Sequence, residues 1–317
     1  VGVHVHARLV SLALDAVALP VAAAHPLAGG VAGGRLHRAV ARLDQAALVR
    51  EVTELVALAS GPLRANSSPM AAVSLSGALT AVVTPFSDDL SEIDWAAFDA
   101  LVEAQLAGGI SGLVPCGTTG ESPTLSDSEQ RELVKRTASL AKGKVPIFAG
   151  TGSNNTKKTI DASKAALEAG ADGVMIVMPY YNKPSQQGLI RHVQTVAKEI
   201  GGAPVILYNI PGRTGVELSV ESTLELLDSS PNVVAIKDAT GNVMWCQELL
   251  RRAAGRVTLL SGDDPLTLPM MVVGASGVIS VTSNLFPREV SEVCADALAG
   301  RWDEARKKHL ALLPVHR

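Results

Sequence analysis

The sequence predicts an α/β fold, a closed (β/α)₈ TIM barrel, and three observations lead to that prediction. From Met70 onward, short apolar runs alternate with amphipathic helical patterns, and eight such runs can be counted. Strands that alternate with helices form right-handed βαβ units and a parallel sheet. Eight units in about 220 residues match the length of such a barrel. A doubly wound open sheet is the alternative, but the first predicted strand lacks the glycine-rich turn that is typical of those sheets.

The eight apolar runs are the predicted strands. Continuous apolar runs of this length are typical of strands that are buried on both faces, as in a parallel sheet. The runs are Leu79–Val83, Gly112–Pro115, Val145–Ala149, Val174–Met178, Val205–Tyr208, Val233–Ile236, Val257–Leu260 and Val278–Val281.

Capping residues mark the helices between these runs. Asp94 is placed to begin a helix, and Ser126 with Glu129 forms a capping box at the start of another. Apolar residues at helical spacing then predict the buried faces. These stripes are Phe98, Leu101 and Val102; Leu133, Val134, Thr137 and Leu140; Val220, Leu224 and Leu227; and Val290, Val293, Cys294 and Leu298.

Composition excludes several classes of function. The net charge is −3 without a basic cluster, which argues against a nucleic-acid partner. Three widely spaced cysteines predict neither a disulfide framework nor a zinc site and suit a reducing compartment, so we expect a cytoplasmic protein. The histidines lack metal-ligand spacing, and we expect no metal. The apolar stretch 9–24 is too short to span a bilayer and contains Asp15 and Pro20, so we expect no membrane partner.

The chain divides by composition into three parts. Residues 1–69 lack strong patterning, and we expect an extension that does not conform to the barrel or is disordered; a targeting segment is the alternative. We expect the barrel to occupy residues 70–300. Residues 301–317 then form the start of a C-terminal helical segment.

Lys237 ends the apolar run Val233–Ile236 and is the first candidate for chemistry. A lysine at the carboxyl end of a buried strand has its stem among apolar groups. Burial disfavours the ammonium form, which leaves part of the amine neutral and nucleophilic near neutral pH. The alternative is an ordinary lysine whose amine reaches solvent.

Other polar residues follow neighbouring predicted strands, at the edge where barrel active sites lie. They include the hydroxyls of Thr118 and Thr119, the phenols of Tyr181 and Tyr208, and the guanidinium of Arg213. For each of them the alternative is a structural role, as a turn residue or as a partly exposed residue at the rim of the barrel. Together, a nucleophilic amine, proton-carrying hydroxyls and a carboxylate-binding arginine predict Schiff-base chemistry on a small keto acid.

A set of motifs makes the chain resemble the dihydrodipicolinate synthase family, which are pyruvate-dependent class I aldolases. The resemblance extends from about Gly77 to the end of the chain. Its motifs are Gly117-Thr-Thr-Gly-Glu121, Pro179-Tyr-Tyr-Asn182, Tyr208-Asn-Ile-Pro-Gly-Arg-Thr-Gly215, Ile236-Lys-Asp-Ala-Thr-Gly241, Leu260-Ser-Gly-Asp-Asp264 and Gly277-Val-Ile-Ser280.

The resemblance implies catalytic roles for four residues. Lys237 would form an imine with pyruvate, so that no separate cofactor is needed, and Tyr208 would position and shuttle protons. Thr119 would link Tyr208 to Tyr181, which in this family comes from the neighbouring subunit. We therefore expect a homo-oligomer, a dimer of dimers if the C-terminus allows it.

It also implies how substrates are bound. Thr118 and Thr119 would hold the pyruvate carboxylate, and Arg213 would bind the carboxylate of L-aspartate 4-semialdehyde. Gly262 and Ile279 would contribute backbone atoms to the pocket. The expected activity is the condensation of these two substrates to 4-hydroxy-tetrahydrodipicolinate, in lysine and diaminopimelate biosynthesis.

Two alternative functions remain open. One is another aldolase of the same superfamily, such as N-acetylneuraminate lyase or a keto-deoxy sugar-acid aldolase; Thr118 and Arg213 favour the synthase. The other is a catalytically inactive barrel, because family members continue beyond the position that matches Arg317.

Residues near the paired tyrosines, Tyr180 and Tyr181, predict how the chain responds to lysine, an inhibitor of many family members. In those enzymes a glutamate offers a negative partner to the ammonium groups of lysine. This chain has Lys158 at that position, so we expect weak or absent inhibition. The other expected pocket residues are Ser122, Asp127, Gln130, Asn154 and Tyr180.

Overall fold

The computed structural model describes residues 75–141 and 143–316. The extension predicted for residues 1–69 lies outside these residues, and the domain limits at 70 and 300 stay predictions. Within the described residues, no helix is both long and apolar enough to cross a membrane.

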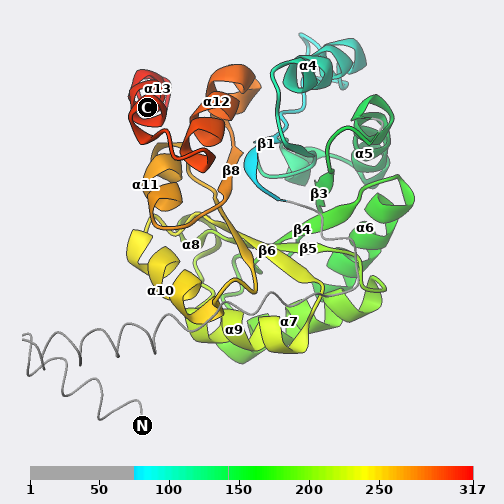
Figure 1. Cartoon of the computed structure of the whole chain (residues 1–317). Helices are drawn as coiled ribbons and strands as arrows, with labels where there is room; N and C mark the ends of the chain where they lie inside the picture. The colour runs from blue at the N-terminus through cyan, green and yellow to red at the C-terminus, as the bar shows by residue number, and fades with distance from the viewer. Residues whose placement is uncertain (1–74, 142, 317) are drawn as a thin grey trace, which may run out of the picture. The chain divides into compact units, whose positions relative to one another are not determined.

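A closed barrel of eight parallel strands forms the centre of the fold (Figure 1). The hydrogen-bonded order is β2-β1-β8-β7-β6-β5-β4-β3, and a parallel bridge from Leu113 to Ile147 closes the ring between β2 and β3. The predicted fold class is therefore confirmed. The strands are β1 Gly77–Ala81, β2 Gly112–Val114, β3 Phe148–Gly150, β4 Gly173–Val177, β5 Val205–Asn209, β6 Val233–Asp238, β7 Thr258–Ser261 and β8 Gly277–Ser280.

One main helix follows each strand, and together these helices surround the barrel (Figure 1). They are α4 Trp95–Ala107, α5 Asp127–Ala141, α6 Thr156–Glu168, α7 Gln186–Glu199, α9 Val220–Ser229, α10 Val243–Ala253, α11 Thr267–Val272 and α12 Pro287–Leu298. Short helical turns occupy the loops: η1 Ser122–Thr124, α8 Pro211–Thr214, η2 Asp264–Leu266 and η3 Thr282–Asn284.

The predicted helix starts are confirmed. The Asp94 carboxylate accepts a hydrogen bond from the Ala97 amide at the start of α4. Before α5, the Ser126 amide donates to the Glu129 carboxylate and the Glu129 amide donates to the Ser126 hydroxyl. This reciprocal pair satisfies two amides that a helix start otherwise leaves without partners.

Some predicted limits were wrong. The third strand begins at Phe148 rather than Val145, because Pro146 has no amide hydrogen to donate to a ladder. In α12, Leu298 is 53% exposed, since the helical period places Ala297 rather than Leu298 in the buried stripe. The sixth strand extends past Ile236 to Asp238, which places Lys237 inside the strand.

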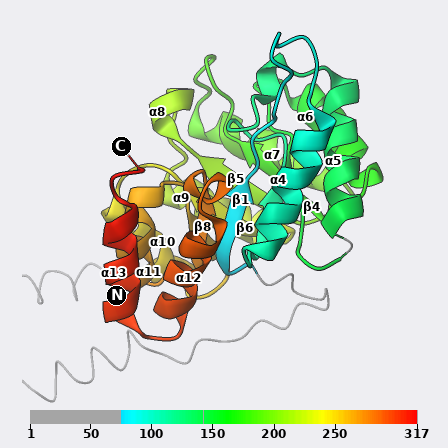
Figure 2. The ribbon, with the colours of Figure 1, turned by 90° about the horizontal axis from the view of Figure 1, so that it is seen from above.

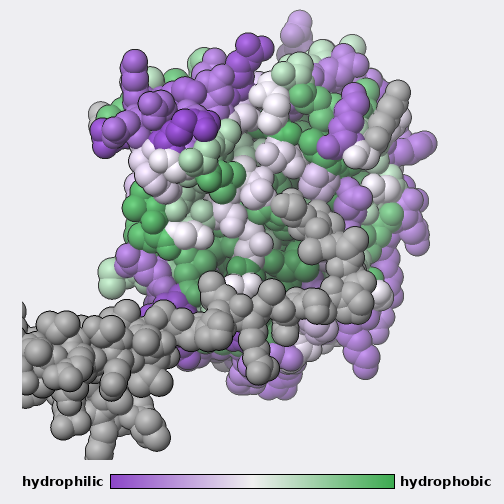
Figure 3. All heavy atoms as spheres, in the orientation of Figure 1, coloured by the Kyte–Doolittle hydropathy of each residue, from purple (hydrophilic) through white to green (hydrophobic). Residues whose placement is uncertain are grey.

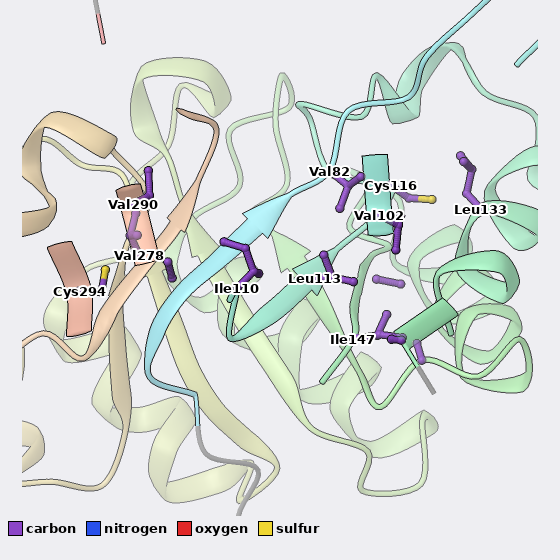
Figure 4. Close-up of a cluster of buried hydrophobic side chains, with 14 of the residues drawn as sticks. Val82, Val102, Ile110, Leu113, Cys116, Leu133, Ile147, Val278, Val290 and Cys294 are labelled. Atoms are coloured by element: carbon purple, nitrogen blue, oxygen red, sulfur yellow. The ribbon is translucent and has the colours of Figure 1, made fainter. Parts of the chain in front are cut away.

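Two layers of apolar side chains hold the barrel together. The inner layer fills the barrel and includes Leu79, Phe148, Met175, Ile206 and Ile279. The outer layer lies between strands and helices. Figure 4 shows part of it, where helix residues such as Val102 and Leu133 and strand residues such as Leu113 and Val278 belong to one buried cluster. Close packing of both layers fixes where each strand ends.

A further helix, α13 (Trp302–Leu312), packs against α12. Ala305 is fully buried in this contact, and Asp296 of α12 accepts a hydrogen bond from Arg301 at 2.6 Å and forms an ion pair with Lys308 at 2.8 Å. The opposite side of α13 is exposed and charged, as Figure 3 shows at the upper left. Figure 2 shows α12 and α13 side by side, away from α5 and α6. Residues 302–312 therefore form the helix that the sequence predicts at this end.

Candidate active site

Lys237 and Tyr208 are neighbours on adjacent strands. Their Cα positions pair in the register of β5 and β6, and the two side chains are 3% and 5% exposed. The Lys237 Nζ atom lies 4.2 Å from the centroid of the Tyr208 ring. Because Tyr208 belongs to the inner layer of the barrel, the amine and the phenol share one enclosed site near the carboxyl ends of the strands.

Burial makes the Lys237 amine a nucleophile. It lowers the pKa of Lys237 from 10.5 to about 8; the negative charge of Asp264 opposes this shift, and Arg213 adds to it. At pH 7, about one molecule in ten then carries the neutral amine, far more than for an ordinary lysine. The contact with the tyrosine ring favours the ammonium, but such contacts contribute only about 0.5–2 kcal/mol. Desolvation therefore dominates.

Tyr208 remains a neutral phenol at physiological pH. Burial raises its pKa to about 12, the Arg213 charge works against this rise, and Asp263 reinforces it. A neutral phenol beside an amine can both donate and accept a proton. The pair therefore combines an amine with raised nucleophilic character and a phenol that can donate or accept a proton.

Gly262 leaves room for the stem of Lys237. A Cβ atom at this position would lie 3.1 Å from the Lys237 Cε and Cγ atoms and 2.9 Å from the Ala239 Cβ. Such contacts are too close for a side chain, so only glycine lets β7 approach the lysine this closely. Ile279, on β8, is fully buried in the inner layer. Gly262 therefore lies against Lys237, and Ile279 lies in the same inner layer as Tyr208.

Thr118 and Thr119 lie in a tight loop after β2. The Gly120 amide donates to the Gly117 carbonyl, and the Gly120 carbonyl accepts from the Thr84 hydroxyl. A Cβ at Gly120 would lie 2.8 Å from the Val82 carbonyl oxygen, which explains the glycine. Thr118 is exposed and Thr119 half-buried, so both remain accessible to a ligand.

Arg213 lies on α8, in the loop that follows β5. Its side chain is exposed, yet its charge influences the pKa of both Lys237 and Tyr208. Its charge therefore contributes to the electrostatic environment of the lysine and the phenol. The planar fork of an arginine can bind a carboxylate with two hydrogen bonds.

Tyr181 differs from the other candidates because its side chain is 88% exposed. Its backbone has a φ of 71°, which is unusual for a residue with a side chain. Over residues 75–141 and 143–316, no hydrogen bond joins the hydroxyls of Thr119, Tyr181 and Tyr208. A relay through all three is thus not formed within this single chain.

Comparison with known proteins identifies the family of the chain. The model of the dihydrodipicolinate synthetase family matches residues 74–317. The chain belongs to the dihydrodipicolinate synthetase family. A relative from Sorangium cellulosum (strain So ce56), named 4-hydroxy-tetrahydrodipicolinate synthase, is 62% identical over 247 residues, which are 78% of this chain and 82% of the relative.

Solved structures of family members have the same fold. The 4-hydroxy-tetrahydrodipicolinate synthase of Methylacidiphilum fumariolicum SolV is 46% identical with a TM-score of 0.75, over 77% of this chain and 80% of that one. The dihydrodipicolinate synthase of Cyanidioschyzon merolae, solved with lysine bound, is 37% identical with a TM-score of 0.74, over 76% and 82%.

Asp264 ends the motif Leu260-Ser-Gly-Asp-Asp264 but was not among the candidate residues chosen from the sequence. Its carboxylate accepts hydrogen bonds from the Ser280 hydroxyl and from the amides of Val281 and Thr282, at 2.5, 2.9 and 3.1 Å. It thereby joins the loop after β7 to the end of β8 and places a negative charge near Lys237. The Ser-Gly-Asp-Asp run after a buried strand was the available signal.

A cavity of about 450 Å³ lies between α5 and α6. Its lining includes five of the six residues expected near the paired tyrosines, namely Ser122, Asp127, Gln130, Lys158 and Tyr180. Asn155 lines the cavity in place of the sixth, Asn154. In the part of the chain that the structure describes, no group of His, Cys, Asp and Glu side chains is placed to hold a metal ion.

Proposed function

We propose that the chain is a 4-hydroxy-tetrahydrodipicolinate synthase, which condenses pyruvate with L-aspartate 4-semialdehyde through an imine on Lys237. The observation that supports this proposal most strongly is the buried Lys237 amine beside the Tyr208 phenol. Burial lowers the pKa of this amine to about 8. Family membership favours this reaction over that of N-acetylneuraminate lyase or a keto-deoxy sugar-acid aldolase.

The proposed chemistry begins at the neutral amine. Lys237 attacks the keto carbon of pyruvate, and loss of water leaves an imine. Removal of a proton from the methyl carbon gives an enamine, which attacks the aldehyde carbon of the second substrate. The amino group of that substrate then displaces the lysine and closes the ring. Tyr208 carries protons in these steps as a neutral phenol, and the lysine amine serves in place of a cofactor.

We assign the carboxylates to two groups of residues. Thr118 and Thr119 hold the pyruvate carboxylate through hydroxyl and backbone donors, since their loop follows β2 at the same end of the barrel. Arg213 binds the carboxylate of the aldehyde substrate. The effect of its charge on the pKa of Lys237 supports this assignment. Gly262 and Ile279 contribute backbone atoms beside the lysine.

We infer that Tyr181 acts in the site of a neighbouring subunit, in a homo-oligomer. Its 88% exposed ring, on a backbone with a φ of 71°, supports this role, because tyrosine is enriched at protein interfaces. A dimer of dimers is the arrangement we propose. Three buried cysteines without disulfide bonds suit the cytoplasm that we propose as its location.

The activity is tested by supplying pyruvate with one aldehyde at a time. Pyruvate should be consumed with L-aspartate 4-semialdehyde and not with N-acetylmannosamine or a sugar aldehyde. Turnover of a sugar aldehyde alone would assign the chain to another aldolase. Formation of an imine without turnover of any aldehyde would mean an inactive barrel.

A further inference from the structure

The side chain of Asn209 clamps a segment of backbone that lies beside the active site. Asn209 is the last residue of β5 and is fully buried. Its Nδ2 donates to the Leu218 carbonyl at 3.1 Å, and its Oδ1 accepts from the Leu218 amide at 3.0 Å. Both backbone groups of Leu218 are therefore held by one side chain.

The clamp closes a loop that carries Arg213. Residues 210–218 leave β5 as α8 and return to Leu218. Inside the loop, the Thr214 hydroxyl bonds the Ile210 and Val216 carbonyls, at 3.0 and 2.8 Å. Arg213 itself is exposed, and no hydrogen bond of its guanidinium is found among the described residues. Its position therefore depends on how firmly the loop is closed.

The same loop reaches the Tyr181 segment. The Tyr181 amide donates to the Thr214 carbonyl at 3.3 Å, and Gly215 packs against the side chain of Lys183, to which a Cβ atom would come within 2.8 Å. Closing the loop at Asn209 thus fixes two neighbouring segments, the loop that carries Arg213 and the segment that carries Tyr181.

Only an amide side chain suits this position. Asparagine offers a donor and an acceptor on one planar group, whereas aspartate only accepts. An aspartate would also put a carboxylate next to Asp238, the neighbour of position 209 on the adjacent strand. Burial already raises the pKa of Asp238 to about 6. An alanine would leave the amide and carbonyl of Leu218, a fully buried residue, without partners.

We propose that Asn209 is a positioning residue for the second substrate: by clamping Leu218 it holds the loop in which Arg213 meets the carboxylate of the aldehyde. Asn209 touches no reacting atom and acts through Arg213. The choice of ligand rests on the proposed function, whereas the clamp itself does not.

Asn209→Ala tests the proposal, and Asn232→Ala is its matched control. The Asn232 side chain also donates two hydrogen bonds to backbone carbonyls, those of Ala197 and Ala203, but it precedes β6 at the opposite end of the barrel. We expect Asn209→Ala to raise the KM for L-aspartate 4-semialdehyde about tenfold or more, as misplacement of a binding group does. Borohydride trapping of pyruvate should be unchanged, and Asn232→Ala should alter neither.

A double-mutant cycle decides whether Asn209 acts through Arg213. In an Arg213→Ala background, removal of Asn209 should raise KM by less than about twofold. Equal effects of Asn209→Ala in both backgrounds would overturn the proposal, and so would an equal loss of pyruvate trapping and aldehyde use. If Asn209→Ala does not fold, Thr214→Val loosens the same loop with little change in volume and should give the same pattern.

Hydrogen exchange separates a failure of the proposal from a failure of the proposed function. The amides of Tyr181, Gly215 and Leu218 should exchange faster in Asn209→Ala than in Asn232→Ala, whatever the enzyme's substrate. Faster exchange without aldehyde turnover by the native chain would leave the clamp standing and overturn the assigned substrate. Unchanged exchange at these amides would overturn the clamp even if the synthase activity is confirmed.

Discussion

The Lys237 amine lies 4.2 Å from the centre of the Tyr208 ring, on the adjacent strand of the barrel. At the surface, neither side chain would have a pKa shifted by burial. Burial lowers the pKa of the lysine to about 8 and raises that of the tyrosine to about 12. The same enclosure therefore makes the amine reactive and keeps the phenol protonated, and this pairing is the basis of the proposed mechanism.

The pH dependence of imine formation should follow the Lys237 pKa. Only the neutral amine attacks, so the rate of pyruvate imine formation should fall about tenfold per pH unit below about 8 and level off above it. Stopped-flow measurement of single-turnover imine formation between pH 6 and 9.5 checks this. A rate that still rises tenfold per unit above pH 9 would show a lysine with an ordinary pKa.

The same shift has a consequence for stability. The folded-state pKa of Lys237, about 8, lies below the unfolded value near 10.5, so between these pH values the unfolded chain binds more protons and the free energy of unfolding rises with pH. Burying the ammonium costs on the order of 3 kcal/mol at pH 7. Lys237→Met should therefore unfold at higher denaturant concentration than the native chain at pH 7, with the difference narrowing towards pH 10.

Tyr208→Phe keeps the ring and removes the hydroxyl that carries protons. We expect turnover to fall by about 10²–10⁴, the contribution typical of a general acid–base group. The rate of pyruvate trapping and the rate of product formation are measured together.

If Tyr181 acts across an interface, mixing Tyr208→Phe and Tyr181→Phe subunits should restore one complete site per mixed dimer. Verified mixed dimers without activity would place Tyr181 outside the partner's site.

A residue of this site could be predicted where a local sequence pattern distinguishes it. Lys237 interrupts an apolar run, and Tyr208 ends a neighbouring one, so both stood out. Asp264 and Asn209 did not, because their partners lie on other segments of the chain: Ser280, Val281 and Thr282 for Asp264, and Leu218 for Asn209. No local pattern encodes such contacts. Helix caps were predictable for the opposite reason, since cap and partner lie within three residues.

Arg213→Ala should separate the two halves of the reaction. Loss of a charge-assisted contact to a carboxylate costs about 1.5–3 kcal/mol, and this cost should appear in the use of L-aspartate 4-semialdehyde. Formation of the pyruvate imine should change little. Steady-state KM values for each substrate, together with borohydride trapping, check this. Equal damage to both halves would make Arg213 a structural residue.

Inhibition by lysine should be weak or absent. Lys158 lines the cavity between α5 and α6 together with Lys157 and Arg131, and like charges facing a ligand's ammonium groups weaken binding. Asp127 and Asp161 line the same cavity and offset part of this charge, and Asp161 forms an ion pair with Lys157. Initial rates are measured with increasing lysine, and Lys158→Glu should become more sensitive than the native chain. Strong inhibition of the native chain at micromolar lysine would contradict the prediction.

The most direct measurement is the site of covalent trapping. Incubation with pyruvate and borohydride should add one three-carbon unit per chain, and peptide mapping should place it on Lys237. Lys237→Ala should remain folded, judged by circular dichroism, and trap nothing. An adduct on another lysine, or none from folded native chain, would contradict the mechanism.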